Sequence, residues 1–149
     1  MDDLLRIAEL KSQGFYCSQI LVQMGLDLQG KSNPDLLRST AALAGGIGFS
    51  GKLCGALTGG ACLLGLYAGK GKPDEGEDER LNLMLLSLVD WFEKTTGSQY
   101  QGCNCEQILE GRQSNIPLRC PVIIQAVYQK AKELLVEYGF DLHGNPDRD

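Results

Sequence analysis

The sequence predicts an all-α protein, a compact single-domain bundle of about six helices with a buried glycine-rich helix at its centre. Apolar residues recur at helical spacing along most of the chain, helix start and stop residues delimit these stretches, and no stretch alternates convincingly as a strand. The 149 residues, 43% of them hydrophobic, are enough to bury a sizeable core without disulfide bonds. We therefore expect one domain over 1–149, with a loose tail over about 140–149.

The first part of the chain contains three expected helices. Residues 2–13 carry an apolar stripe at helical spacing, and a second helix is expected over 17–25. In the third, over 32–44, Asn33 is the expected N-cap and Pro34 takes the first helical position.

The later part contains three more. Residues 77–96 repeat apolar side chains at helical spacing and end at Gly97. A short helix is expected over 105–111. The last helix runs over 121–138, and Cys120 is its natural N-cap because a proline follows it.

Between these parts lies the stretch "GGIGFSGKLCGALTGGACLLGL", residues 45–66. Seventeen uncharged residues separate Lys52 from Lys70, just short of the roughly 18–20 that a membrane span needs. The sequence also fails the phosphate-loop pattern, because Leu53 follows Lys52 and the glycine spacing differs. We predict a helix buried in the core, with small residues that let neighbouring helices approach and a flexible glycine hinge before it.

The charge balance and the number of cysteines narrow the classes of function that the protein can have. Fourteen Lys and Arg stand against nineteen Asp and Glu, and without a basic run there is no nucleic-acid footprint. The N-terminal segment lacks the features of a secretory signal, so we expect a cytoplasmic protein with reduced thiols. Six cysteines in a reducing compartment indicate metal binding or redox chemistry. The C-x-x-C motif is absent, and the single histidine, His143, leaves no plausible Cys–His catalytic pair.

Four cysteines fall at expected helix starts, where free N–H groups and a partial positive charge favour the thiolate. Taken singly, a free cysteine is also a common small core residue, which is the reading we prefer for Cys62. Cys103 is a spare thiol beside the short helix. The four at helix starts are Cys17, Cys54, Cys105 and Cys120.

The motifs "FYCSQIL", "GGIGFSGKLCGALTGG", "CEQILEG" and "RCPVIIQAV" together resemble the C-GCAxxG-C-C family, whose members are described only as redox-active. The resemblance spans about 15–135, and its middle motif reads Cys-Gly-Ala where the family name has Gly-Cys-Ala. It implies that the family's four cysteines are Cys17, Cys54, Cys105 and Cys120, with Cys105 favoured over Cys103 by the aliphatic pair that follows it. The related split-Soret cytochromes carry c-type haem, but without C-x-x-C-H this chain has no site for covalent haem.

Three hypotheses follow. In the first, these four cysteines ligate an iron–sulfur cluster, or zinc as its redox-inert counterpart, and Gly55 and Gly59 let the backbone approach it. The protein would then exchange electrons with a partner protein that the sequence does not identify. In the second, two or more of the thiols cycle through a disulfide without a metal. In the third, the cysteines are core residues of a helical binding or scaffold module. A homodimer would suit the small-residue helix.

Overall fold

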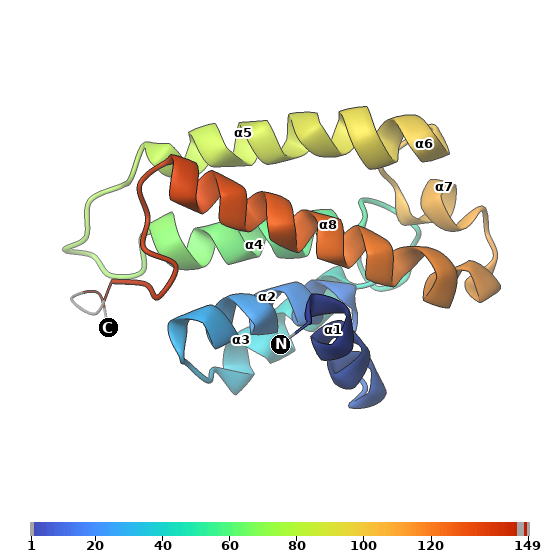
Figure 1. Ribbon diagram of the computed structural model, residues 1–149, viewed down its shortest axis with the longest axis horizontal. Coiled ribbons are helices and arrows are strands. Elements are labelled where there is room, and N and C mark those ends of the chain that lie inside the picture. The colour runs from blue at the N-terminus through green and yellow to red at the C-terminus, as the bar shows by residue number, and fades with distance from the viewer. Residues whose placement is uncertain (1, 146–147, 149) are drawn as a thin grey trace.

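The computed structural model describes residues 2–145 and 148, and its regular elements in that part are helices, which confirms the predicted all-α class (Figure 1). One isolated antiparallel bridge joins two loops. In chain order the elements are α1 (Asp3–Ser12), α2 (Cys17–Gln29), α3 (Pro34–Thr40), η1 (Ala41–Leu43), α4 (Gly55–Ala68), α5 (Arg80–Phe92), η2 (Glu93–Gly97), α6 (Ser98–Tyr100), α7 (Cys105–Leu109), η3 (Gln113–Asn115) and α8 (Ile116–Glu137).

Helix α4 is the glycine-rich central helix that the sequence predicts. It packs against α2, α5 and α8, and Leu63 and Leu64 on it are fully buried. A Cβ added at Gly59 would lie 2.9 Å from the Cα and the carbonyl oxygen of Ser18 on α2. Because nothing larger than glycine fits there, the two backbones can lie in close contact, as expected for small residues on a buried helix.

Two glycines that the sequence suggests as helix stops are not stops. At Gly25, α2 continues to Gln29. A Cβ at Gly25 would lie only 2.9 Å from Leu63 Cγ, so glycine at this position allows close packing against α4. The helical path also continues through Gly97, where the π-helical segment η2 joins α5 to α6 in one rod (Figure 1). Both glycines allow a neighbouring side chain to lie close to the helix backbone, and neither ends a helix.

The start of the last helix also differs from the prediction. Helix α8 begins at Ile116, so Cys120 lies inside the helix and is not its N-cap. Pro117 occupies the first turn, where its fixed φ favours a helix start, whereas Pro121 lies inside the helix and removes one i→i−4 hydrogen bond. The helix nevertheless continues through Pro121 to Glu137.

The segment expected to be a hinge is a hydrogen-bonded loop. Residues 45–49 all have positive φ, including the non-glycine residues Ile47 at 70° and Phe49 at 61°. The Gly51 amide donates to the Gly45 carbonyl at 3.0 Å, and the next amide donates to the Gly46 carbonyl at 3.1 Å. Tyr16, just before α2, contacts Phe49 edge to face with ring centroids 5.1 Å apart.

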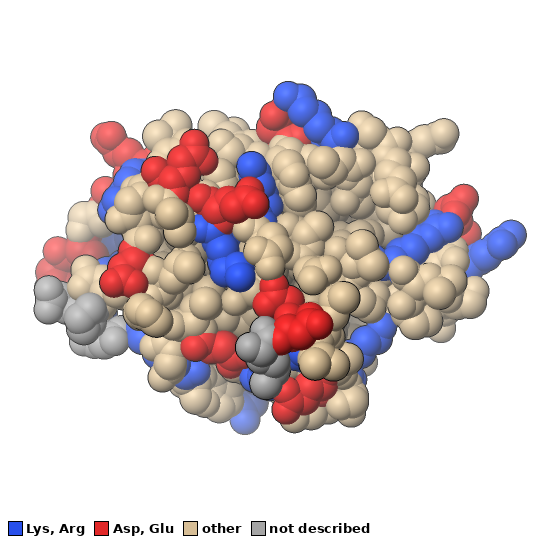
Figure 2. Space-filling model, in the orientation of Figure 1, with Lys and Arg blue, Asp and Glu red and all other residues tan. Residues whose placement is uncertain are grey.

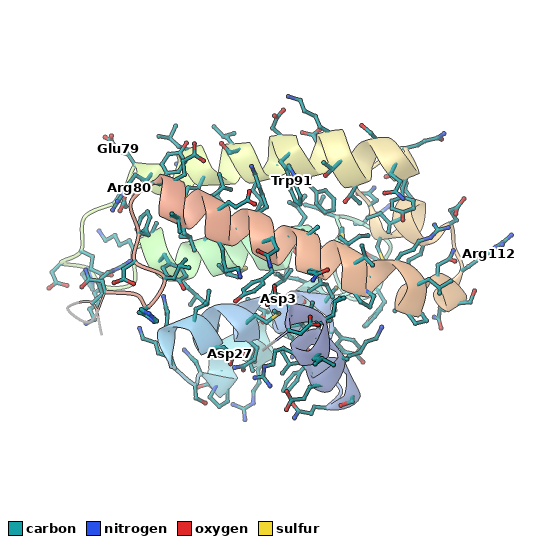
Figure 3. All side chains as sticks on the ribbon, viewed as in Figure 1. Asp3, Asp27, Glu79, Arg80, Trp91 and Arg112 are labelled. Atoms are coloured by element: carbon teal, nitrogen blue, oxygen red, sulfur yellow. The ribbon has the colours of Figure 1, made fainter. Side chains whose placement is uncertain are left out.

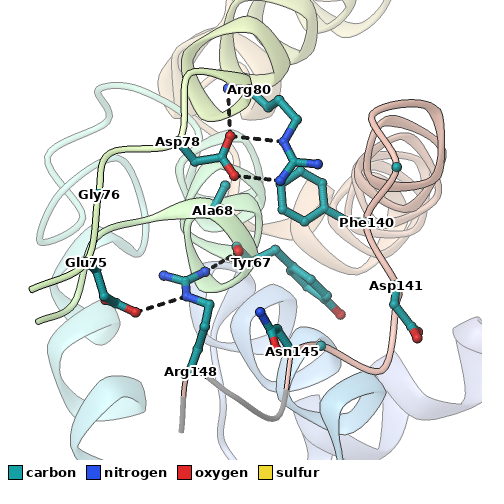
Figure 4. A pocket seen from close by; sticks show the side chains of 12 residues that line it. Tyr67, Ala68, Glu75, Gly76, Asp78, Arg80, Phe140, Asp141, Asn145 and Arg148 are labelled. Carbon is teal, nitrogen blue, oxygen red and sulfur yellow. Dashed lines mark hydrogen bonds and ion pairs between the residues drawn. The ribbon is translucent and has the colours of Figure 1, made fainter.

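Part of the tail expected to be loose over about 140–149 lies against the bundle, in residues 140–145, whereas residues 146, 147 and 149 lie outside the described residues. The Tyr67 hydroxyl donates to the Leu142 carbonyl at 2.7 Å, and the Arg80 guanidinium lies 3.8 Å from the centroid of the Phe140 ring. Figure 4 shows the pocket that Tyr67, Arg80 and Phe140 border, where Asp78 pairs with Arg80 at 2.7 Å. This pocket lies at the end of α4 opposite to Cys54.

An ion pair links the N-terminal helix to α2, and charged side chains of one sign do not gather on the face in view. Asp27 lies on α2 (Figure 3), and Arg6 of α1 pairs with it at 2.8 Å. On the face shown in Figure 2, acidic and basic side chains are interspersed. Within the described residues, each helix is too short or too polar to cross a membrane.

Candidate functional site

Four of the six cysteines line one small cavity beside the start of α4. Its volume is about 20 Å³, which is room for little more than one water-sized sphere. The cysteines reach it from α2, the N-cap of α4, α7 and α8, and the other lining residues are glycine or apolar. The lining residues are Cys17, Cys54, Gly55, Ala56, Cys105, Ile108, Leu109, Cys120 and Ile123.

Cys17 and Cys54 come together because α2 and α4 begin at the same place. Cys17 is the first residue of α2, and Cys54 is the N-cap of α4. Between them, a Cβ built on Gly55 would lie 2.5 Å from Cys17 Sγ. Real Cβ atoms essentially never come this close to another atom, so glycine at 55 is what lets the Cys17 sulfur reach the start of α4.

Cys105 is held beside Cys54 by a short antiparallel pairing of two loops. Its centre is the bridge between Leu53 and Asn104, and it ties the loop before α4 to the start of α7. The backbone hydrogen bonds of the pairing run from Cys54 N to Cys103 O (3.0 Å), from Cys105 N to Lys52 O (2.6 Å) and from Glu106 N to Gly51 O (3.1 Å).

Burial raises the pKa of all four thiols, which is the main electrostatic property of the site. For Cys54 the pKa rises to about 12; the neighbouring Cys17 adds to this effect, and the backbone amides of Ala56 and Leu57 oppose it. For Cys120 burial raises the pKa to about 11. At neutral pH these thiols are therefore protonated and weak nucleophiles, unless a bound cation stabilises the thiolates.

Of the four thiols, Cys17 has the most neighbouring groups that oppose the rise in pKa caused by burial. Burial raises its pKa, whereas the amides of Gly45 and Ser18, its own amide and the ammonium of Lys11 lower it. Gly45 belongs to the positive-φ loop, so that loop supplies an N–H to the site as well as connecting η1 to α4. The sequence analysis did not assign this contribution to the loop.

The two other cysteines and one candidate glycine lie outside the cavity. Cys62 packs against the core cluster of Val22, Leu26 and Leu37. Cys103 packs beside Gly97, whose added Cβ would lie 3.0 Å from its Sγ, so Cys105 rather than Cys103 reaches the cavity. Gly59, expected to clear space for a cofactor, faces the backbone of Ser18 and not the cavity.

The donor set suits a thiolate-bound metal centre, but the spacing does not yet match one. Four sulfur donors are the ligand set that iron–sulfur clusters and structural zinc prefer. Within residues 2–145 and 148, however, no group of three or more His, Cys, Asp or Glu is spaced to hold an ion. The cysteine side chains would have to rearrange, and the cavity would have to widen for a cluster.

Fold and site together define a class: an all-helical protein with four cysteines from separate elements around one buried pocket. The model of the family described as "Putative redox-active protein (C_GCAxxG_C_C)" matches residues 15–134, and the chain belongs to this family. All four cavity cysteines lie within the matched residues. No curated protein and no solved structure matches the chain.

Proposed function

We propose that the protein is an electron-transfer protein in which Cys17, Cys54, Cys105 and Cys120 hold an iron–sulfur cluster. The observation that supports this most is the sharing of one apolar cavity by four thiols from four separate segments. Burial keeps these thiols neutral and unreactive by themselves, and a bound cationic centre is what would make thiolates stable there.

Each part of the site has a role in this proposal. The cluster supplies one-electron redox chemistry when bound. The four cysteines would be its ligands, and the N–H groups of Gly45, Ala56 and Leu57 would favour negative charge on the Cys17 and Cys54 sulfurs. Ala56, Ile108 and Ile123 exclude water, and the partner is a redox protein that gives or takes the electron in a reducing compartment such as the cytoplasm.

The test is the metal content and absorption spectrum of protein purified without oxygen. We expect visible absorption, with iron and acid-labile sulfide in stoichiometric amounts. Cys17→Ser and Cys54→Ser should each lose most of the iron, whereas Cys62→Ser, a matched cysteine further along α4, should keep it. Stoichiometric zinc would replace the proposal with a redox-inert site, and full iron in the Cys54→Ser protein would rule out the ligand assignment.

A thiol–disulfide protein is the second candidate, favoured by the small cavity and by ligand spacing that does not match a metal site. Here two of the four thiols would cycle between reduced and disulfide forms. Metal-free protein that stays colourless after a reconstitution attempt, and that forms a disulfide under mild oxidant, would support it. If only free thiols remain after oxidant and no metal binds, the cysteines are core residues of a helical module.

A further inference from the structure

Cys103 lies directly opposite Cys54 in the short antiparallel pairing. The bridge joins Leu53 to Asn104, so the next pair outward is Cys54 with Cys103, and the Cys54 amide donates to the Cys103 carbonyl at 3.0 Å. Residues opposite each other in a regular antiparallel ladder have Cα atoms about 4.5–5.5 Å apart and side chains on one face. Here the pair makes one of its two possible hydrogen bonds, because the Cys54 carbonyl accepts from the amides of Leu57 and Thr58 at the start of α4. The ladder separation lies within the range of about 4.4–6.8 Å that disulfides require.

Cys105 stands in a less favourable relation to Cys54. It lies on the same face of the pairing, but diagonally across from Cys54 rather than opposite it. Diagonal neighbours are about 7–8 Å apart, at or beyond the separation that a disulfide can bridge without moving the backbone. By backbone register, Cys103 is therefore the better disulfide partner for Cys54, whereas by side-chain position Cys105 shares the cavity with it.

Both sulfurs are free, and the side chains must turn for a bond to form. Cys103 Sγ now lies beside Gly97, and Cys54 lines the cavity. Cys103 is partly exposed, whereas Cys54 is buried. An oxidant from solution therefore reaches Cys103 first, and Cys54 is placed to react with the product.

We propose that Cys103 forms a disulfide with Cys54 when the cavity holds no cofactor, which gives the chain a thiol switch outside the four family cysteines. The oxidant is a small-molecule disulfide such as oxidised glutathione. The Cys103 thiolate attacks it, forming a mixed disulfide and releasing one glutathione thiolate. The Cys54 thiol then gives up its proton to solvent, and its sulfur attacks the Cys103 sulfur and releases the second glutathione. The two protein thiols lose two electrons and two protons in all, and the oxidant becomes two glutathione thiols.

The test is disulfide mapping of metal-free full-length protein incubated with oxidised glutathione, alkylated and digested with trypsin without reduction. Cys54 falls in peptide 53–70, and Cys103 falls in peptide 95–112 together with Cys105. We expect these two peptides to be linked. Variants must identify the residues, because each peptide contains two cysteines.

The discriminating pair is Cys103→Ser against Cys105→Ser, two changes in the same peptide. We expect the link to disappear in Cys103→Ser and to persist in Cys105→Ser and in Cys62→Ser. The opposite result for Cys103 and Cys105, a link to the peptides of Cys17 or Cys120, or unlinked peptides would each overturn the proposal. Because it is made on metal-free protein, the result does not depend on whether iron binds the native chain, and the iron assay is read separately.

Discussion

At the scale of single residues, Gly55 connects the fold to the site. Its Cα hydrogen occupies the space where any Cβ would come 2.5 Å from Cys17 Sγ. We expect Gly55→Ala to lower the free energy of unfolding by about 1–3 kcal/mol, as overpacking of a close contact does. Gly65 on the same helix has open space around its Cα, so Gly65→Ala should be neutral or stabilising by about 0.5–1 kcal/mol. Urea unfolding of both variants measures this, and equal stability losses would contradict it.

The buried thiol of Cys54 predicts a pH dependence. Burial raises its pKa from 9.0 to about 12 in the folded chain, so between these values the unfolded chain binds fewer protons than the folded chain. The stabilising effect of the neutral thiol is complete below about pH 9 and is lost as the pH rises toward 12. For metal-free protein, we expect the stability lost over this range to be smaller in Cys54→Ser, whose hydroxyl does not titrate. Unfolding curves at several alkaline pH values test this, and identical pH dependence in both proteins would contradict it.

The sequence predicts which residues line the site better than it predicts which residues lie opposite one another there. Helix-start patterns and the family resemblance singled out the four cysteines that line the cavity. The pairing of Cys103 with Cys54 was not predicted, because it depends on a two-residue contact between loops about fifty residues apart. Such a short pairing leaves no alternating pattern in the sequence.

At the scale of elements, the loop of residues 45–51 carries unusual backbone strain. Ile47 has φ 70° and is 56% exposed as a residue, so the conformation is costly for a β-branched side chain and little packing offsets the cost. We expect Ile47→Gly to raise the free energy of unfolding by about 1 kcal/mol, whereas Ile47→Val, which keeps the branch, should not. The denaturation midpoint measures both, and a loss of stability in Ile47→Gly would show that the side chain makes a stabilising contact.

Element boundaries were predicted less well than element types. Asn33 caps α3 as expected, with its side chain accepting from the Leu36 amide at 3.1 Å. Gly25, Gly97 and Pro121 resemble stop or start signals in the sequence but lie within helical segments. Tertiary packing decides the two glycines, since each lies close to a side chain from another part of the chain, and the sequence pattern does not contain such contacts.

At the scale of the whole molecule, convergence of the cysteines is a property of the bundle. Cys17, Cys54, Cys105 and Cys120 are separated by 37, 51 and 15 residues, and such separations do not fix distances in space. They meet because α2, α4 and α8 pack together and the loop pairing brings in α7. Loss of bundle packing should therefore expose all four thiols together.

This predicts that the site and the bundle unfold as one cooperative unit. Leu64 on α4 is fully buried, and Leu64→Ala should lower the free energy of unfolding by about 2–5 kcal/mol, since it leaves a cavity in the core. Leu86 on α5 is 69% exposed, and Leu86→Ala should change stability by no more than about 0.5 kcal/mol. In the Leu64→Ala protein, helix content by circular dichroism and reactivity of Cys54 toward a thiol reagent should change at the same denaturant concentration. If Cys54 became reactive well before the helices unfolded, the site would be a separately opening part of the fold rather than a product of the whole bundle.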